Sequence, residues 1–128
     1  MRLLLDTHAL LWWWSDSPRL SIAARKAIAE ESNQVHLSAA SAWEIATKHR
    51  LGRLPGFEGA ATRFIELASN SRFPILAITP AHALRAGALD GAHGDPFDRM
   101  LAAQSEIEGL VLVTLDPAFA SFGVRTLW

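Results

Sequence analysis

The amino-acid sequence predicts an α/β fold with a central parallel sheet between helices, a three-layer α/β/α arrangement. Short apolar stretches alternate with longer helix-forming stretches along the whole chain, which is typical of a parallel sheet covered on both faces. The short stretches are continuously apolar, as in "LVLVT" at 110–114, and such strands are buried on both sides. A length of 128 residues favours one domain, spanning 1–128, that buries a core without cross-links.

The first half of the chain begins with an apolar run that ends in an acid, "RLLLD" at 2–6, which predicts a buried strand. Ile22, Ala24 and Ile28 share one face of the next clear helical pattern. Gly52 is a usual helix stop. The expected elements are a strand at 2–6, a helix or turn at 7–14, a helix at 21–31, a strand at 34–38 and a helix at 39–52.

In the second half, "DPFDRMLAAQ" at 95–104 has the pattern of a helix start. Asp95 suits the N-cap, Pro96 the first helical position and Asp98 the first turn. The expected elements are a turn at 54–56, a helix at 57–71, a strand at 74–79, a helix at 80–89, a glycine-rich loop at 90–95, a helix at 96–108, a strand at 110–114, a short helix at 116–123 and a last strand at 124–127.

Composition excludes several classes of protein. Half of the residues are hydrophobic and 20% are charged, as in a folded globular protein. There is no cysteine, which excludes disulfides and thiolate metal sites and fits the cytoplasm. The apolar block at 9–14 is too short to span a bilayer, and Asp6 interrupts the stretch where a signal peptide needs apolar residues. The net charge of −1 creates no general attraction to nucleic acid.

Four of the thirteen acids fall near strand-to-helix crossings: Asp6, Glu44, Asp98 and Asp116. Ligands of open α/β sheets bind beyond the carboxyl ends of the strands, so these carboxylates are expected to converge. Converging carboxylates repel one another strongly without a cation, and oxygen ligands without sulfur select Mg²⁺ or Mn²⁺. Such a site suits phosphodiester hydrolysis by a metal-activated water.

Each of these acids also has a purely structural interpretation. Asp6, Asp98 and Asp116 suit helix starts, and Glu44 is spaced to pair with Lys48 on a helix surface. The histidines at 8, 49 and 93 have no zinc-site spacing and are interpreted as non-ligands. No Ser-His-Asp pattern and no phosphate-binding glycine loop is visible.

Four motifs in this order resemble the PIN-domain ribonucleases, and specifically the VapC-like toxins of type II toxin–antitoxin pairs. They are "LLLDTHALLWW", "SAASAWEIATKHRLGRL", "DPFDRMLAAQ" and "LVTLDPAF". The resemblance covers nearly the whole chain. It implies a PIN-like three-layer fold and Mg²⁺- or Mn²⁺-dependent endonuclease cleavage of RNA that leaves a 3′-hydroxyl and a 5′-phosphate. It also implies a homodimer and a VapB-like antitoxin whose tail fills the active-site groove.

By this resemblance the catalytic and metal-binding acids are Asp6, Glu44, Asp98 and Asp116. The small polar helpers of the family match Thr7, Ser41 and Thr114, whose hydroxyls would orient a carboxylate or a metal-bound water. Asp95 is placed in a supporting position as the helix cap. The sequence departs from many relatives at His8, where asparagine is common, which bears on the fine geometry of the site.

Two further groups have open interpretations. Lys48, Arg50 and Arg53 are either a solvated helix end or cations that guide the RNA backbone toward the metal. Trp12, Trp13 and Trp14 cannot all face one core from one helix, so we expect at least one at a partner surface. The alternatives are that the following loop covers them or that they stack on RNA bases.

Competing functions are less consistent with the sequence. A haloacid-dehalogenase phosphatase needs a second Asp where this chain has His8, and a receiver domain needs several early acids. A PIN fold without catalytic activity, acting as an RNA- or protein-binding module, is the alternative from another class. Cleavage of DNA is a further alternative, because a metal ion held by carboxylates can act on the phosphodiester backbone of RNA or of DNA.

Overall fold

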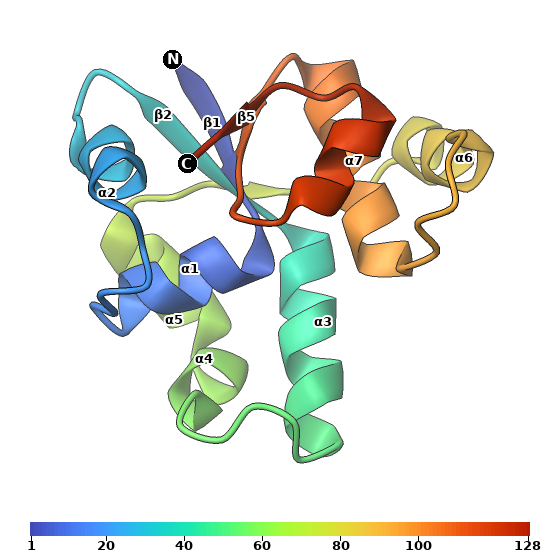
Figure 1. Ribbon diagram of the computed structural model, residues 1–128. Helices are drawn as coiled ribbons and strands as arrows, with labels where there is room; N and C mark the ends of the chain where they lie inside the picture. Colours follow the sequence, from blue (N-terminus) through green and yellow to red (C-terminus); the bar gives the residue numbers. More distant parts are fainter.

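The computed structural model describes residues 1–128 and contains five strands and seven α-helices, with one 3₁₀-helix. Figure 1 shows the sheet at the centre of the molecule, between two groups of helices. The elements are β1 (Arg2–Leu5), α1 (Thr7–Trp14), α2 (Ile22–Ala29), β2 (Gln34–Ser38), α3 (Ala39–Arg50), α4 (Glu58–Thr62), α5 (Phe64–Ser71), β3 (Ile75–Leu76), α6 (Pro80–Ala88), α7 (Pro96–Glu108), β4 (Val111–Val113), η1 (Pro117–Phe122) and β5 (Thr126–Leu127).

The sheet is parallel throughout, with the strand order β3-β2-β1-β4-β5. Leu3 at its centre pairs with Val35 of β2 on one side and with Val111 of β4 on the other. The first three strands are added outward from β1, and the chain then returns to place β4 on the opposite side of β1. This reversal creates a topological switch point between β1 and β4, where α/β folds form their ligand crevice.

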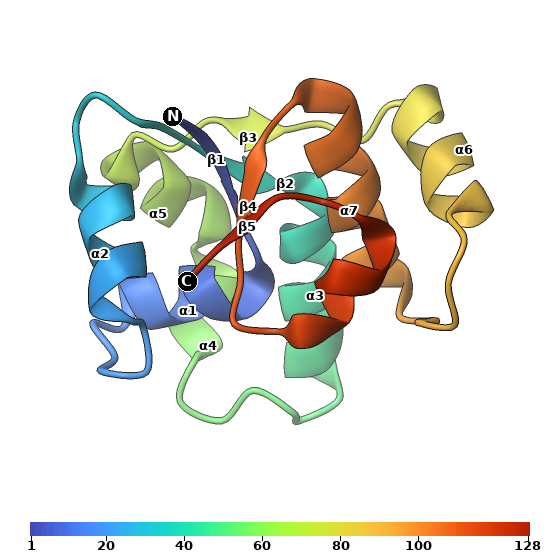
Figure 2. The ribbon, with the colours of Figure 1, turned by 45° about the horizontal axis from the view of Figure 1, so that its top comes forward.

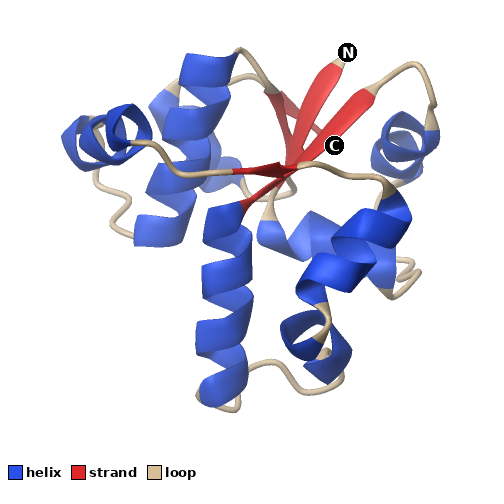
Figure 3. Ribbon diagram, turned by 180° about the vertical axis from the view of Figure 1, so that it is seen from behind, coloured by secondary structure: helices blue, strands red, loops and turns tan.

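Side chains of alternate residues in β1 enter two separate cores. Leu3 and Leu5 pack into a cluster with residues of α1, α2, α4 and α5. Leu4 faces the opposite way, into a second cluster with residues of α6, α7 and η1. Figure 3 shows the strands from behind with helices on both sides, and in Figure 2 α6 lies outside α7. The predicted three-layer α/β/α fold is confirmed.

The structure corrects several predicted features. The last strand, expected at 124–127, is limited to Thr126–Leu127. Ile22, expected to share a helix face with Ala24 and Ile28, is exposed, whereas those two residues are buried. The helix expected at 57–71 is interrupted at Arg63, whose φ of −128° and ψ of 24° lie outside the helical range. Ala60 before the break and Phe64 after it both lie in the core. The strand expected at 74–79 is reduced to Ile75–Leu76, because it lies at the sheet edge and pairs only with the end of β2.

The three consecutive tryptophans are covered by other parts of the chain. Trp14 packs edge-on against Phe64 and donates its indole N–H to Ser71 Oγ at 3.0 Å. Trp13 lies against Phe73, and Trp12 contacts the C-terminal Trp128. Packing against α5 and the C-terminus leaves all three rings half-buried, and the expectation that at least one of them contacts a partner stays a prediction. No helix of the structure combines the length and the apolar character needed to cross a membrane.

Candidate active site

Asp6 lies at the switch point, directly after β1. Its backbone N–H extends the ladder by donating to Val113 O at 3.0 Å, and its Oδ1 caps α1 by accepting from Ala9 N at 2.7 Å. Thr114, directly after β4, donates its hydroxyl to Asp6 Oδ2. The carboxylate is therefore held from both neighbouring strands, and its residue is only 6% exposed.

Burial has a large electrostatic effect on this carboxyl group. It raises the pKa of Asp6 from 3.8 to about 6, although the hydrogen bonds from Thr114 and Ala9 act in the opposite direction. The negative charge of Asp98 raises this pKa further, while His8 lowers it. A carboxylate whose ionised form is this disfavoured gains strongly from a nearby cation.

Glu44 on α3 is buried as well, at 4% exposure. Its Oε1 accepts the Thr7 hydroxyl at 2.6 Å, and Ser41 Oγ lies 3.0 Å from the same Thr7 oxygen. Its Oε2 pairs with the Lys48 ammonium one helical turn later. The surface interpretation of this pair is wrong: Lys48 neutralises an interior carboxylate, because α3 begins at the carboxyl end of β2 and turns this face toward α1.

The helix start at 95–98 combines capping with the site. Asp95 Oδ1 accepts from the N–H groups of Phe97 and Asp98 at 2.9 and 3.0 Å, which confirms its role as the cap of α7. Asp98 Oδ2 lies 2.7 Å from His93 Nε2. Burial raises the pKa of the Asp98 carboxyl, and the negative charges of Asp95 and Glu44 raise it further. Its hydrogen bond in turn raises the pKa of His93.

Asp116 is the exposed member of the group. It caps η1 by accepting from Ala118 N at 2.9 Å, and its own N–H donates to Thr114 Oγ1 at 3.0 Å. Thr114 therefore links Asp6 to Asp116. Single ligand atoms of His93, Asp98 and Asp116 all lie within 4.8 Å of one another.

The structure thus brings the predicted acids to one edge of the sheet but separates them into two parts. Asp98 and Asp116 meet at the surface, whereas both oxygens of Asp6 and of Glu44 are engaged by internal partners. The two parts nevertheless interact electrostatically. The negative charge of Asp98 raises the pKa of Asp6, and the negative charge of Glu44 raises the pKa of Asp98. Clustered carboxylate oxygens with one imidazole fit a hard divalent ion.

Sequence reasoning missed His93. The spacing of the histidines predicts no zinc site and no ligand role for His93, whereas the structure brings it to Asp98, five residues later, and to Asp116, which follows β4. Its place in the loop just before the Asp95 cap was the available signal. Trp43 was also missed: it precedes Glu44 and is 56% exposed.

The predicted basic group is divided. Lys48 belongs to the site through Glu44, while Arg50 and Arg53 are exposed at and beyond the end of α3. In Figures 1 and 3 this helix extends away from the sheet.

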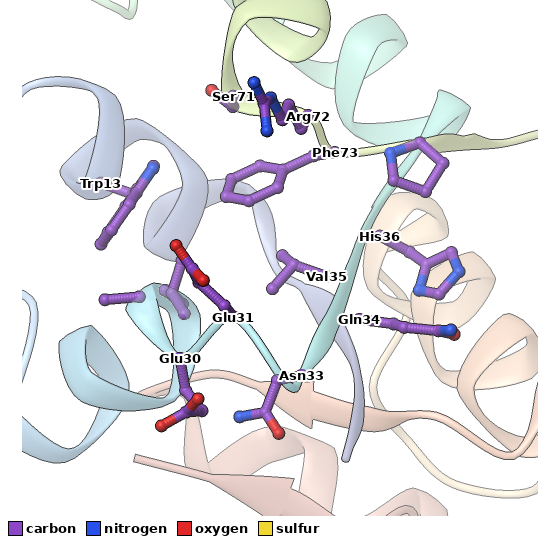
Figure 4. Close-up of a pocket in the computed structure, with 13 residues that line it drawn as sticks. Trp13, Glu30, Glu31, Asn33, Gln34, Val35, His36, Ser71, Arg72 and Phe73 are labelled. Carbon is purple, nitrogen blue, oxygen red and sulfur yellow. The ribbon is translucent and has the colours of Figure 1, made fainter.

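A surface hollow of about 860 Å³ lies elsewhere, beside the start of β2. Trp13 and Phe73 line it together with Glu30, Glu31 and Arg72, as Figure 4 shows. None of the four acids borders it. The hollow is therefore separate from the candidate site, whose carboxylates lie at the opposite end of the strands.

The model of the PIN domain family matches residues 3–124. The chain belongs to the PIN domain family. Ribonuclease VapC22 from Mycobacterium tuberculosis (strain ATCC 25618 / H37Rv) is 35% identical over 114 residues, which are 88% of this chain and 85% of the relative. This similarity groups the chain with the VapC-like PIN proteins, as the sequence motifs predict.

Solved structures agree with the PIN fold. VapBC2 from Rickettsia felis, bound to a DNA fragment of its promoter, superposes with a TM-score of 0.73 at 15% identity and covers 100% of this chain and 99% of that chain. VapBC-1 from nontypeable Haemophilus influenzae has a TM-score of 0.71 at 21% identity, covering 99% and 97%. At these identities the likeness concerns the fold.

Proposed function

We propose that this PIN protein is a metal-dependent endoribonuclease and the toxin of a VapBC-type toxin–antitoxin pair. The observation that carries the proposal is the approach of Asp6, Glu44, Asp98 and Asp116, from four separate segments, to the carboxyl edge of the sheet. The similarity to Ribonuclease VapC22 supports RNA as the substrate.

Asp6, Asp98 and Asp116, with Glu44, are the residues that would hold Mg²⁺ or Mn²⁺. When bound, such an ion lowers the pKa of a coordinated water and offsets charge that develops on the phosphate. Thr114 and the Ala9 N–H orient Asp6, Thr7 and Ser41 orient Glu44, and Asp95 fixes the helix start that presents Asp98.

The reaction is hydrolysis of a phosphodiester bond. The oxygen of water forms a bond to phosphorus, the bond from phosphorus to the 3′-oxygen breaks, and the 3′-oxygen takes up a proton. The products are a 3′-hydroxyl and a 5′-phosphate. Lys48, Arg50 and Arg53 supply positive charge along α3 that would guide the RNA backbone to the acids.

The partners follow from the same comparison. Because the structural neighbours include VapBC complexes, we infer that a VapB-like antitoxin binds this chain. We also propose that the toxin forms a homodimer, as the resemblance to the VapC-like toxins implies. A tail of the antitoxin that enters the acidic groove would block the substrate site.

A cleavage assay tests the activity. The purified chain, free of antitoxin, is incubated with a mixed RNA pool in Mg²⁺ or Mn²⁺ and, in parallel, in EDTA. We expect discrete cuts that require the metal and disappear in Asp6→Asn, with Asp90→Asn as an exposed control. Intact RNA, together with no metal binding by calorimetry, would instead favour a catalytically inactive PIN module that binds RNA or protein.

A further inference from the structure

One aromatic pair, the exposed Trp43 and the half-buried Phe97, borders the acidic site and has no part in the mechanism above. Trp43 on α3 and Phe97 on α7 meet edge to face, with ring centroids 4.7 Å apart and planes at 73°. Each aromatic residue directly precedes a carboxylate of the site, Glu44 in one helix and Asp98 in the other. Both helices therefore carry the same pair of residue types in the same order, an aromatic residue followed by an acidic one.

The helical geometry places the pair on the rim of the site. Successive residues of a helix point about 100° apart, so each ring flanks the direction of its neighbouring carboxylate and does not occlude it. The contact between Trp43 and Phe97 bridges α3 and α7. It forms an aromatic wall beside the two acids whose charges interact across the same gap.

Packing alone does not account for this wall. Trp12, Trp13, Trp14 and Trp128 are all partly buried, whereas Trp43 is 56% exposed. Its contact with Phe97 leaves most of the indole surface open to solvent. Aromatic side chains are enriched at binding surfaces, and base stacking uses such exposed rings.

We propose that Trp43, supported by Phe97, stacks on an unpaired nucleobase of the RNA and thereby positions the adjoining phosphate at the acids. This proposal rests on the ribonuclease function proposed above. Every base offers a π-face for stacking, but in a duplex its neighbours cover that face. Trp43 is thus a positioning residue that selects single-stranded segments.

A nucleobase fits this position better than a protein segment does. The wall stands beside groups suited to a phosphodiester, and Lys48 on the same helix adds a cation next to Glu44. A nucleotide has a flat aromatic base next to a negatively charged phosphate. Along α3, Trp43 would contact the base, while a cation held by the acids and Lys48 would face the phosphate.

The test compares cleavage kinetics of a single-stranded RNA that the wild-type chain cuts with kinetics of the same RNA annealed to its complement. Trp43→Ala should raise KM for the single strand roughly tenfold to hundredfold with a smaller change in kcat. Trp43→Phe keeps a stacking face and should retain most of the affinity. Ile65→Ala, which truncates an apolar residue on α5 that is 77% exposed, is the control.

A second measurement locates the base that Trp43 contacts. Single abasic sites are scanned along the RNA, and one position should weaken cleavage by the wild type but not reduce it further in Trp43→Ala. Adding RNA in EDTA should also quench tryptophan fluorescence in the wild type more than in Trp43→Phe.

The outcomes separate the two proposals. If the wild type cuts RNA but KM, the abasic scan and quenching are unchanged by Trp43→Ala, stacking is wrong and the nuclease stands. If Trp43→Ala instead loses only antitoxin binding, the wall is a protein contact and the stacking proposal is overturned. If the wild type cuts no RNA, both proposals fail.

Discussion

At the residue scale, Asp6 serves the fold and the site with the same side chain. Its Oδ1 caps α1 and its Oδ2 accepts from Thr114 across the switch point. Burial makes ionisation unfavourable, so the capping bonds only partly compensate for the cost of an interior negative charge. In the proposed nuclease, Asp6 lowers the stability of the metal-free protein, and its carboxylate is already oriented to bind a metal ion.

This cost predicts a pH dependence of stability in EDTA. The folded-state pKa of Asp6 is about 6, above the value of 3.8 for the free side chain. Below the lower value both states are protonated. Between the two values the unfolded chain ionises first, so the free energy of unfolding falls as pH rises, by about 3 kcal/mol once pH exceeds the folded pKa.

Chemical denaturation at pH 4 to 8 measures this change. Asp6→Asn should remove most of the decline between about pH 4 and 6 and should stabilise the metal-free protein at neutral pH. Asp90→Asn, at an exposed position, should leave the profile unchanged. A decline of equal size in wild type and Asp6→Asn would contradict the assignment. The raised pKa of His93 also removes stability as pH rises, but at higher pH.

At the scale of elements, α7 organises the loop before it. Arg99, one residue after Asp98, donates from Nε to Ala86 O at 2.9 Å and from Nη1 to His93 O at 3.0 Å. Its Nη2 also contacts Leu89 O, and the guanidinium lies 5.7 Å from the centroid of Phe122. One side chain of the helix thus holds the loop that carries His93.

Arg99→Ala should therefore loosen this loop and cost roughly 1–3 kcal/mol of stability, because several partly buried carbonyls lose their donor. Arg99→Lys should recover only part of the lost stability, since a single ammonium group cannot reproduce the several hydrogen bonds of the planar guanidinium. Hydrogen exchange of residues 87–95 is the readout. Arg85→Ala, which removes an exposed pair with Glu106, is the control and should have a much smaller effect on stability. Unchanged protection of the loop would show that other contacts hold it.

The basic end of α3 makes a separate prediction for RNA binding. If Arg50 and Arg53 contact phosphates, replacing both by glutamine should make the dependence of log K on log salt shallower by roughly 0.7 for each lost contact. Fluorescence anisotropy across a salt series measures the slope, with Arg19→Gln on an exposed position as the charge-matched control. An unchanged slope would mean that these arginines are solvent-exposed residues at the helix end with no contact to RNA.

At the scale of the whole molecule, the strand order brings distant segments together. Asp6 and Thr114 are separated by 108 residues in sequence yet share a hydrogen bond, because β1 and β4 are neighbours in the sheet. The site therefore exists only when β1 and β4 are paired in the folded sheet, and ligand binding there should stabilise the entire fold.

Metal binding should accordingly raise the melting temperature. Mg²⁺ or Mn²⁺ at a hundred times its Kd adds about 2.7 kcal/mol to the free energy of unfolding, or roughly 8 °C in Tm for a chain of this size. Asp98→Asn should greatly reduce the shift. Calorimetry of both proteins with and without metal measures it, and the same shift in Asp98→Asn and wild type would place the ion elsewhere.

Local patterns in the sequence determined most of the fold. The predicted helix start at Asp95 and Pro96, the buried central strands and the alternation of elements are all confirmed. These features depend on chain neighbours and on burial on both faces, which local sequence encodes. The exceptions are the break at Arg63 and the short edge strand β3, where tertiary packing and the lack of a second neighbour decide the outcome.

The sequence by itself also determined which acids stand near the strand ends, since that follows from element order. Only the tertiary structure decided how they are partnered: Lys48 with an interior Glu44, His93 with Asp98, and Trp43 with Phe97. His93 and Trp43 had no distinctive local pattern. The spacing of Glu44 and Lys48 predicted their pair but not its burial, and the contact of Trp43 with Phe97 requires that α3 and α7 lie side by side. The direction of each side chain depends on burial, charge and packing that no short stretch of sequence contains.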